Sequence, residues 1–221
     1  IRNANNIAVA ALWKNGVMHE LSDGITNATA NSVFISGSDV YVAGFVNDAN
    51  NVAIATLWKN GIAQELSNGI VDAYPQSVFV DGQDVYVVGS MDYSPHLAVL
   101  WKNGVMTELY EGNNESRARS VSVVEGDVYI GGYIYDDNNL SVATLWKNGA
   151  KQELSDLNGS SSIVSVFIDG SNVYGAGYST NASNDRVATY WKNGIAQTFD
   201  DGNINTVIFS IFVQNDVVYA T

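Results

Sequence analysis

Residues 98–109 read Ala-Val-Leu-Trp-Lys-Asn-Gly-Val-Met-Thr-Glu-Leu, and the central Trp-Lys-Asn-Gly occurs five times in the 221-residue chain. The five copies begin at Trp13, Trp58, Trp101, Trp146 and Trp191, with spacings of 45, 43, 45 and 45 residues. A fixed period of this length is typical of architectures in which each repeat is one supersecondary unit. The chain is therefore an array of repeats.

Each repeat has the pattern of four short β-strands. In the first full repeat these cover residues 32–35, 40–43, 52–59 and 62–66, which are rich in β-branched and aromatic residues. The dipeptide Asn60-Gly61 between the last two strands favours a type I′ hairpin turn, because both of its central residues need positive φ. We expect an antiparallel four-stranded sheet from every repeat.

The two ends of the chain together supply one further repeat. Residues after 207 have the pattern of the first two strands, and residues before 21 have that of the last two. This arrangement predicts an all-β, five-bladed β-propeller that forms a single domain over residues 1–221. Its blades cover residues 32–67, 77–110, 119–154 and 163–199, and a closing blade is shared by residues 207–221 and 1–21.

The repeated tryptophan admits two interpretations. Five copies of a Trp side chain are suited to stacking on sugars, but the strand that carries each Trp has apolar or small residues on both faces, with Ala three positions before it. We therefore expect these side chains to pack between neighbouring blades.

The charge is strongly negative. With 23 acidic and 10 basic residues the net charge is −13, which argues against nucleic acid as a partner. Five of the basic residues are the Lys of the repeated motif, so we expect the acids to dominate the opposite, loop-bearing face. The loop acids are Asp23, Asp48, Asp72, Asp92, Glu111, Glu115, Asp136, Asp137, Asp156, Asp185, Asp200 and Asp201.

The variable loop between the second and third strands is the predicted binding region, because variable loops on a regular scaffold commonly carry specificity. The candidate ligand-binding residues in these loops are Asp48, Asn50, Asn51, Asp92, Tyr93, Tyr135, Asp136, Asp137, Asn138 and Asp185. Their oxygen atoms also suit calcium, although no loop has an EF-hand spacing. Solvated turn residues are the alternative interpretation, and we expect no cofactor or metal.

The sequence lacks the groups that common enzyme mechanisms need. It has no cysteine and only two histidines, His19 and His96, neither of which lies in a motif with a nucleophile. We expect no enzymatic activity. No apolar run is long enough to span a membrane as a helix, so no membrane insertion is expected, and the chain is expected to be monomeric.

The pattern Ala-x-Leu-Trp-x-Asn-Gly-x-Met-x-Glu-Leu at residues 98–109 resembles the bacterial "HAF" probable extracellular repeat. Only the Ala of the family's His-Ala-Phe triplet is present. The resemblance covers all five repeats and implies an extracellular or cell-surface bacterial protein, without implying a defined activity.

Three functions fit these features. The first is a non-enzymatic binding or scaffold propeller that presents its acidic loop face to a ligand or protein partner. The second is a multivalent carbohydrate-binding lectin with up to five related sites between blades. The third is an engineered or excised propeller that has no ligand.

Overall fold

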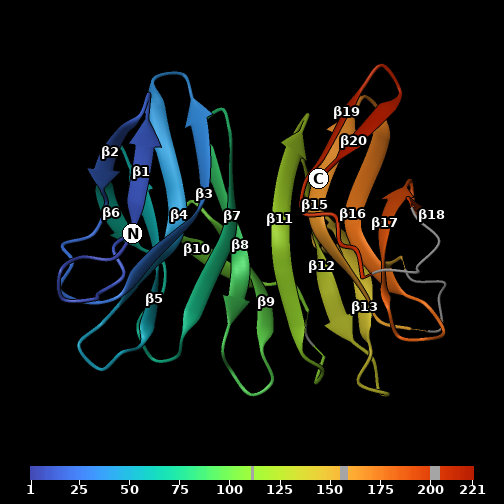
Figure 1. The fold of residues 1–221 in the computed structure, drawn as a ribbon, viewed down its shortest axis with the longest axis horizontal. Coiled ribbons are helices and arrows are strands. Elements are labelled where there is room, and N and C mark those ends of the chain that lie inside the picture. Colours follow the sequence, from blue (N-terminus) through green and yellow to red (C-terminus); the bar gives the residue numbers. More distant parts are fainter. Residues whose placement is uncertain (111, 155–158, 200–204) are drawn as a thin grey trace. The chain divides into compact units, whose positions relative to one another are not determined.

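The structure is a computed structural model, and it describes residues 1–110, 112–154, 159–199 and 205–221. These residues form twenty β-strands and no helix, and every sheet is antiparallel (Figure 1). The all-β prediction is confirmed. The chain divides into two compact units, Ile1–Glu108 and Leu109–Thr221, which are described separately below.

The first unit holds three sheets. One pairs β1 with β2, one has the order β3-β4-β5-β6, and one has the order β7-β8-β9-β10. The strands are β1 (Ala11–Lys14), β2 (Val17–Glu20), β3 (Ala28–Ser36), β4 (Asp39–Asn47), β5 (Ala53–Lys59), β6 (Ile62–Glu65), β7 (Ala73–Asp81), β8 (Asp84–Met91), β9 (Leu97–Lys102) and β10 (Val105–Glu108).

The second unit mirrors this order. Two four-stranded sheets, β11-β12-β13-β14 and β15-β16-β17-β18, are followed by a two-stranded sheet of β19 and β20. The strands are β11 (Ser116–Val124), β12 (Asp127–Tyr135), β13 (Ser141–Lys147), β14 (Ala150–Glu153), β15 (Ser161–Asp169), β16 (Asn172–Thr180), β17 (Arg186–Lys192), β18 (Ile195–Thr198), β19 (Ile211–Gln214) and β20 (Val217–Ala220).

Four of the predicted blades are thus four-stranded sheets at the expected places. The predicted closing blade is not confirmed, because β1 with β2 and β19 with β20 are two separate two-stranded sheets. The five-bladed ring therefore stays a prediction.

The first strand of each four-stranded sheet is longer than the sequence pattern indicates. β3 begins at Ala28, before the predicted start at residue 32, because a β-bulge between Ala30 and Ser32 allows pairing with β4 to continue beyond the irregularity. Gly44 lies opposite this bulge, where an added Cβ would be 1.9 Å from the carbonyl oxygen of Thr29. Gly89, Gly132 and Gly177 are equally confined, which explains the repeated glycine of the second strand.

The repeated serine of the first strand joins neighbouring sheets. The hydroxyl of Ser32 accepts a hydrogen bond of 3.2 Å from the backbone N of Val78 in β7. In the second unit, Ser120 accepts the equivalent bond of 3.0 Å from Val166 in β15. These bonds fix the spacing between stacked sheets.

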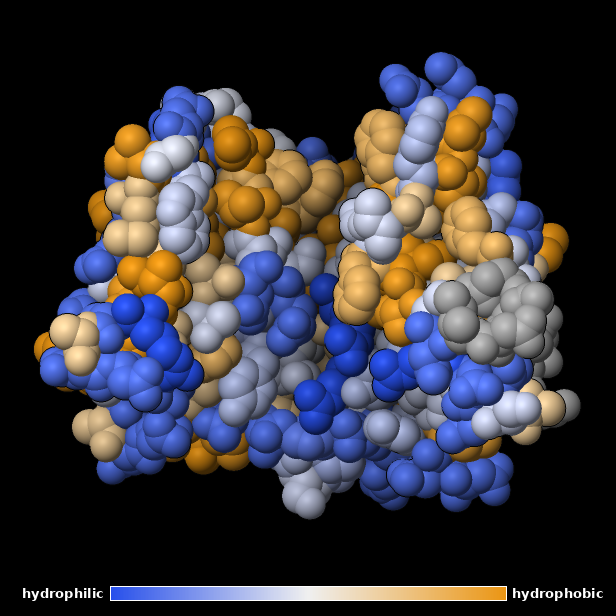
Figure 2. Space-filling model, viewed as in Figure 1, coloured by the Kyte–Doolittle hydropathy of each residue, from blue (hydrophilic) through white to orange (hydrophobic). Residues whose placement is uncertain are grey.

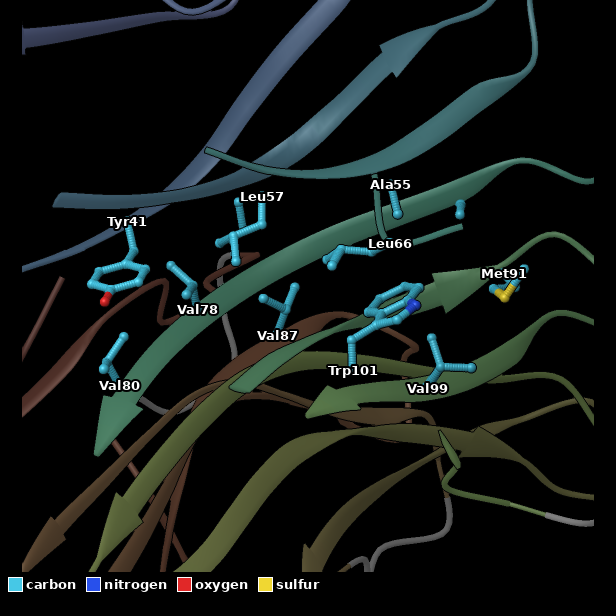
Figure 3. Packing of buried hydrophobic residues seen from close by; sticks show 12 residues of the cluster. Tyr41, Ala55, Leu57, Leu66, Val78, Val80, Val87, Met91, Val99 and Trp101 are labelled. Atoms are coloured by element: carbon cyan, nitrogen blue, oxygen red, sulfur yellow. The ribbon is translucent and has the colours of Figure 1, made fainter. Parts of the chain in front are cut away.

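Tryptophan fills the space between the sheets. Trp101 belongs to a cluster with Leu57 and Leu66 of the preceding sheet, and Figure 3 shows its ring among Leu66, Val87 and Val99. Trp58, Trp101, Trp146 and Trp191 are fully buried, so core packing is confirmed for four of the five copies. Trp13, in the two-stranded sheet of β1 and β2, is the exception at 56% exposed.

The other three residues of the Trp-Lys-Asn-Gly motif also have structural roles. Asn60 and Gly61 have φ values of 52° and 81°, as a type I′ turn requires. The side chain of Asn60 accepts a bond from the backbone N of Val40 and donates one to Asp39. Lys59 pairs with Asp39 at 2.9 Å and lies 5.1 Å from the centre of the Tyr41 ring. The motif therefore ties together the two hairpins of one sheet.

We predict that Gly132→Ala destabilises the protein by about 2 kcal/mol, since its Cβ would lie 2.0 Å from the carbonyl oxygen of Arg117 and the backbone would have to move. The measurement is the midpoint of urea unfolding. Gly126→Asn is the control, because Gly126 has φ +83° with no atom within 4 Å of an added Cβ, and asparagine tolerates positive φ. Equal midpoints for the two variants would contradict the close-packed bulge.

Candidate functional site

The loops between the second and third strands mark what we call the loop side of each sheet. Asp48 opens the first such loop, and its Oδ1 accepts hydrogen bonds from the backbone N of Asn50 (2.8 Å) and of Val52 (2.9 Å). The backbone N of Asp48 donates to the carbonyl of Val52, and Asn51 has φ 67°. The carboxylate therefore holds its own loop in shape.

The same arrangement occurs at three other places. Asn3, Asp136 and Asn181 each accept two backbone N–H groups at the equivalent positions, two and four residues further along the chain. Asp and Asn are interchangeable here because the loop uses a single side-chain oxygen. The bonds from Val52 and Asn50 lower the pKa of Asp48, and those from Leu140 and Asn138 lower the pKa of Asp136.

The other predicted site residues differ in their hydrogen-bond partners and ring contacts. The Asn50 and Asn138 side chains bond back to Asp48 and Asp136, and Asn51 accepts a bond from Asn47. Asp137 accepts one from Asn114, and the Tyr135 ring packs edge-on against Tyr133 at 5.5 Å.

The remaining three predicted residues belong to two loops. The Asp92 carboxylate lies against the His96 imidazole, and the neighbouring Tyr93 is 38% exposed. The backbone N of Asp185 donates to Asn181. Most of these groups thus bond within their own loop, whereas Asp137 bonds to Asn114 in the loop before β11. Among the loop acids of the sequence analysis, Glu111, Asp156, Asp200 and Asp201 lie outside the described residues.

A cavity of about 290 Å³ lies on the loop side of the first unit, between the β1–β2 sheet and the β3–β6 sheet. Asp48 is the one predicted site residue in its wall. Two further carboxylates, Asp23 and Glu65, join it there. The lining residues are Leu21, Ser22, Asp23, Val46, Asn47, Asp48, Ile54, Thr56, Trp58, Ala63 and Glu65. We call this space the loop-side cavity.

Two polar groups of this wall are buried without a partner. They are the indole Nε1 of Trp58 and the Oδ1 of Asn47. In the equivalent Trp101, Figure 3 shows the indole nitrogen on the side of the ring that faces Met91. The indole nitrogens of Trp101, Trp146 and Trp191 are likewise buried without a partner, so this feature belongs to the repeat and not to the cavity alone. Buried polar groups without a partner are rare in folded proteins, and each one needs an explanation.

Sequence reasoning did not find this cavity. Trp58 is predicted to lie in the core and is fully buried, and it is also one of the residues that line the space. Asn47 lies on β4 and Glu65 on β6, and the sequence pattern does not distinguish either from an ordinary strand residue. No local pattern identifies them, because the cavity draws on three strands and two loops.

A second kind of cavity lies at the opposite, hairpin side of the sheets, and each unit contains a copy of it. The first copy, about 290 Å³, contains Leu12, His19, Ser38 and Asn60. The second, about 270 Å³, has Leu145, Gln152, Ser171 and Asn193 at the equivalent positions. Spaces between neighbouring sheets are thus a recurrent feature of the repeat.

In the described part of the chain, no group of three or more His, Asp or Glu side chains is placed to hold a metal ion. No described helix is long and apolar enough to cross a membrane. The chain matches none of the known protein-family models, and the search of curated proteins also found no match.

We predict that replacing Asp48 and Asp136 with Asn makes stability less sensitive to acid. Because their native pKa values are lowered, both carboxylates stabilise the fold above the unfolded-state pKa of about 3.9, and this contribution is lost as the pH falls through the native pKa. Asn keeps the capping oxygen, as Asn181 shows, and does not titrate.

The measurement compares urea midpoints at neutral pH and at about pH 2, well below the unfolded-state pKa. The midpoint of the double variant should fall less than that of the native protein. An equal fall in both proteins would mean that the two carboxylates have ordinary pKa values.

Proposed function

We propose that the chain is a non-enzymatic binding module that takes its ligand or protein partner on the acidic loop side, with the loop-side cavity as the contact site. The observation that carries this proposal is the composition of the cavity wall. Asp23, Asp48 and Glu65 lie there without any Lys, Arg or His. A net charge of −13 adds a long-range attraction for cationic partners.

The histidines offer no support for catalysis. His96 pairs with Asp92 in a loop, and His19 lies in the hairpin-side cavity beside Glu20, with no nucleophilic side chain in that wall other than Ser38 and Lys14. Neither histidine lines the loop-side cavity. We therefore propose binding without turnover.

We also propose that the chain forms a five-bladed propeller, that it is extracellular or on the cell surface, and that it is a monomer. In the ring that we propose, β20 pairs with β1, and the other repeats give the register: Tyr41 faces Lys59 and Val42 faces Trp58, so Tyr219 faces Lys14 and Ala220 faces Trp13. The resemblance to the HAF repeat supports an extracellular or cell-surface bacterial protein. The acidic charge argues against nucleic acid, and we propose a monomer.

Exposed apolar residues on both terminal hairpins support closure. Trp13 is 56% exposed, whereas its four equivalents are buried. On the other hairpin Phe212 and Val217 are each 50% exposed and Tyr219 is 56% exposed. Figure 2 shows hydrophobic residues gathered over β19 and β20. A shared fifth blade would remove these side chains from water, which is favourable at about 25 cal/mol per Å².

Closure predicts that Trp13 is protected in solution. Acrylamide quenching of tryptophan fluorescence is the measurement, on the native protein and on Trp13→Phe. If the ring closes, neither protein has a readily quenched component. A quenched component that is present in the native protein and lost in Trp13→Phe would contradict closure.

The loop-side site predicts ligand-dependent stabilisation that requires the three carboxylates. The probes are arginine, spermidine and a set of monosaccharides, and the measurement is the shift in Tm, because a ligand that binds only the native state must raise it. At least one probe should stabilise the native protein and have no effect on the triple variant Asp23→Asn, Asp48→Asn, Glu65→Gln.

The triple variant is designed to keep the fold. Asn68 accepts the same backbone bond at the position of Asp23, and Asn181 does so at that of Asp48. Asp136→Asn combined with Glu108→Gln is the matched control outside the cavity and should respond to the probes as the native protein does. A native protein that no probe stabilises would contradict the proposal and favour a propeller without a ligand.

A second candidate is the multivalent lectin with related sites between blades. The hairpin-side cavity favours it, because it recurs in both units with equivalent residues. Calorimetry with a bound glycan discriminates between the two functions. Several equivalent sites per chain support the lectin, and one site supports the loop-side cavity.

A further inference from the structure

The five Trp-Lys-Asn-Gly turns share one backbone geometry. Their asparagines have φ values between 50° and 52°, and the glycines that follow have φ values between 79° and 86°. All five asparagines are exposed. They are Asn15, Asn60, Asn103, Asn148 and Asn193. The copies therefore agree in sequence, turn type and exposure, and differ only in their hydrogen-bond partners.

Four of these asparagines are held to the adjacent hairpin by three hydrogen bonds. The backbone N of Asn60 donates to the carbonyl of Val40 at 2.8 Å, and its Oδ1 accepts from the backbone N of Val40 at 2.9 Å. Its Nδ2 donates to Asp39 at 2.8 Å. The same three bonds join Asn103 to Val85 and Asp84, Asn148 to Val128 and Asp127, and Asn193 to Val173 and Asn172.

Asn15 is the copy that lacks these bonds. It lies in the turn between β1 and β2, which pair only with each other. Among the residues that the structure describes, Asn15 makes none of the three bonds. Its side-chain amide is therefore not fixed by a neighbouring strand.

The sequence supports this difference whether or not the ring closes. The residue that accepts from the asparagine Nδ2 lies two positions before the repeated tyrosine, and it is Asp39 beside Asn60. In the last repeat this position, two before Tyr219, holds Val217, which has no side-chain acceptor. In the closed ring that we propose, Asn15 would still lack the bond from Nδ2.

An asparagine that precedes glycine has a reactive amide, because glycine has no Cβ to shield its backbone nitrogen. After losing its proton to a base, the Gly16 nitrogen bonds to Cγ of Asn15. The Cγ–Nδ2 bond breaks, and Nδ2 leaves as ammonia. Water then opens the five-membered imide at either carbonyl and yields aspartate or isoaspartate. The step is a hydrolysis, and water is its one co-reactant.

The rate of this step depends on local opening of the turn. The imide forms only when Cγ can rotate onto the glycine nitrogen, and bonds from Oδ1 and Nδ2 oppose this rotation. A two-stranded hairpin on its own is marginally stable and opens readily. Each hydrogen bond that has to break lowers the open fraction by up to about tenfold.

We propose that Asn15 is a site of spontaneous deamidation, whereas its four equivalents are protected by the adjacent hairpin. The reaction adds a negative charge to the β1–β2 turn beside Lys14. The inference rests on the turns alone and is independent of the proposed binding function.

The test incubates the native protein in mildly alkaline buffer and follows each Asn-Gly peptide by mass spectrometry, which detects the exchange of the amide NH2 for OH. We expect Asn15 to react about tenfold or more faster than Asn60, Asn103 and Asn148, since it lacks three bonds that they make. In concentrated urea the five copies should react at similar rates, because their tetrapeptides are identical.

The inference is overturned if Asn15 reacts no faster than the other copies in the native protein. It is also overturned if Asn15 is equally far ahead in urea, because the difference would then be intrinsic to its neighbours in sequence.

Two variants test the cause of the protection. Asp39→Val gives Asn60 the neighbour that Val217 provides in the last repeat, and it should accelerate deamidation of Asn60 severalfold while Asn103 is unchanged. Asp39→Asn is the matched control and should keep Asn60 slow, because Asn172 accepts the equivalent bond from Asn193.

A general loss of stability would accelerate Asn103 and Asn148 as well, so these two copies report on folding in every variant. If Asp39→Val leaves Asn60 as slow as Asn103, the side-chain bond does not protect the amide and the inference is overturned.

Discussion

The fold depends on the burial of each small sheet against the next. A four-stranded sheet whose strands are only four to nine residues long cannot cover its own apolar faces. In both units the indole of a tryptophan fills the space toward the preceding sheet, as Trp58 and Trp191 do. Small residues such as Ala55 and Ala143 allow the close approach, and serine hydroxyls bridge the first strands. Removal of one neighbour exposes a whole row of side chains.

The local parts of this fold could be predicted from the sequence. The hairpin turns depend on the positive φ of Asn and Gly, which is a property of adjacent residues, and they were placed correctly. The bulge was missed, because it arises in the pairing of β3 with β4, where Gly44 leaves room for the backbone of Thr29 and Ala30. The predicted closing blade would draw its strands from both ends of the chain, and no local pattern tests it.

The candidate site shows a different limit. Asp48, Asn50 and Asn51 are predicted site residues because polar loop residues are available for ligands, yet the Asp48 carboxylate accepts hydrogen bonds from its own loop and the Asn50 amide donates one to it. Composition does not distinguish a capping oxygen from a free one. Asp48 also lines the cavity, so that part of the prediction and the structure agree. Trp58 and Glu65 lie on the paired strands β5 and β6, and the space that they line forms only where this sheet packs against the preceding hairpin.

Loops that are stabilised by their own Asp or Asn side chain affect how such a protein evolves. Since Asn3, Asp48, Asp136 and Asn181 each stabilise their loop without help from another repeat, the residues between the caps are released from packing constraints. One loop can mutate, or be exchanged for that of a sister repeat, while the rest of the array keeps its stability. Each repeat can therefore acquire a new binding specificity in its own loop while the other repeats keep theirs.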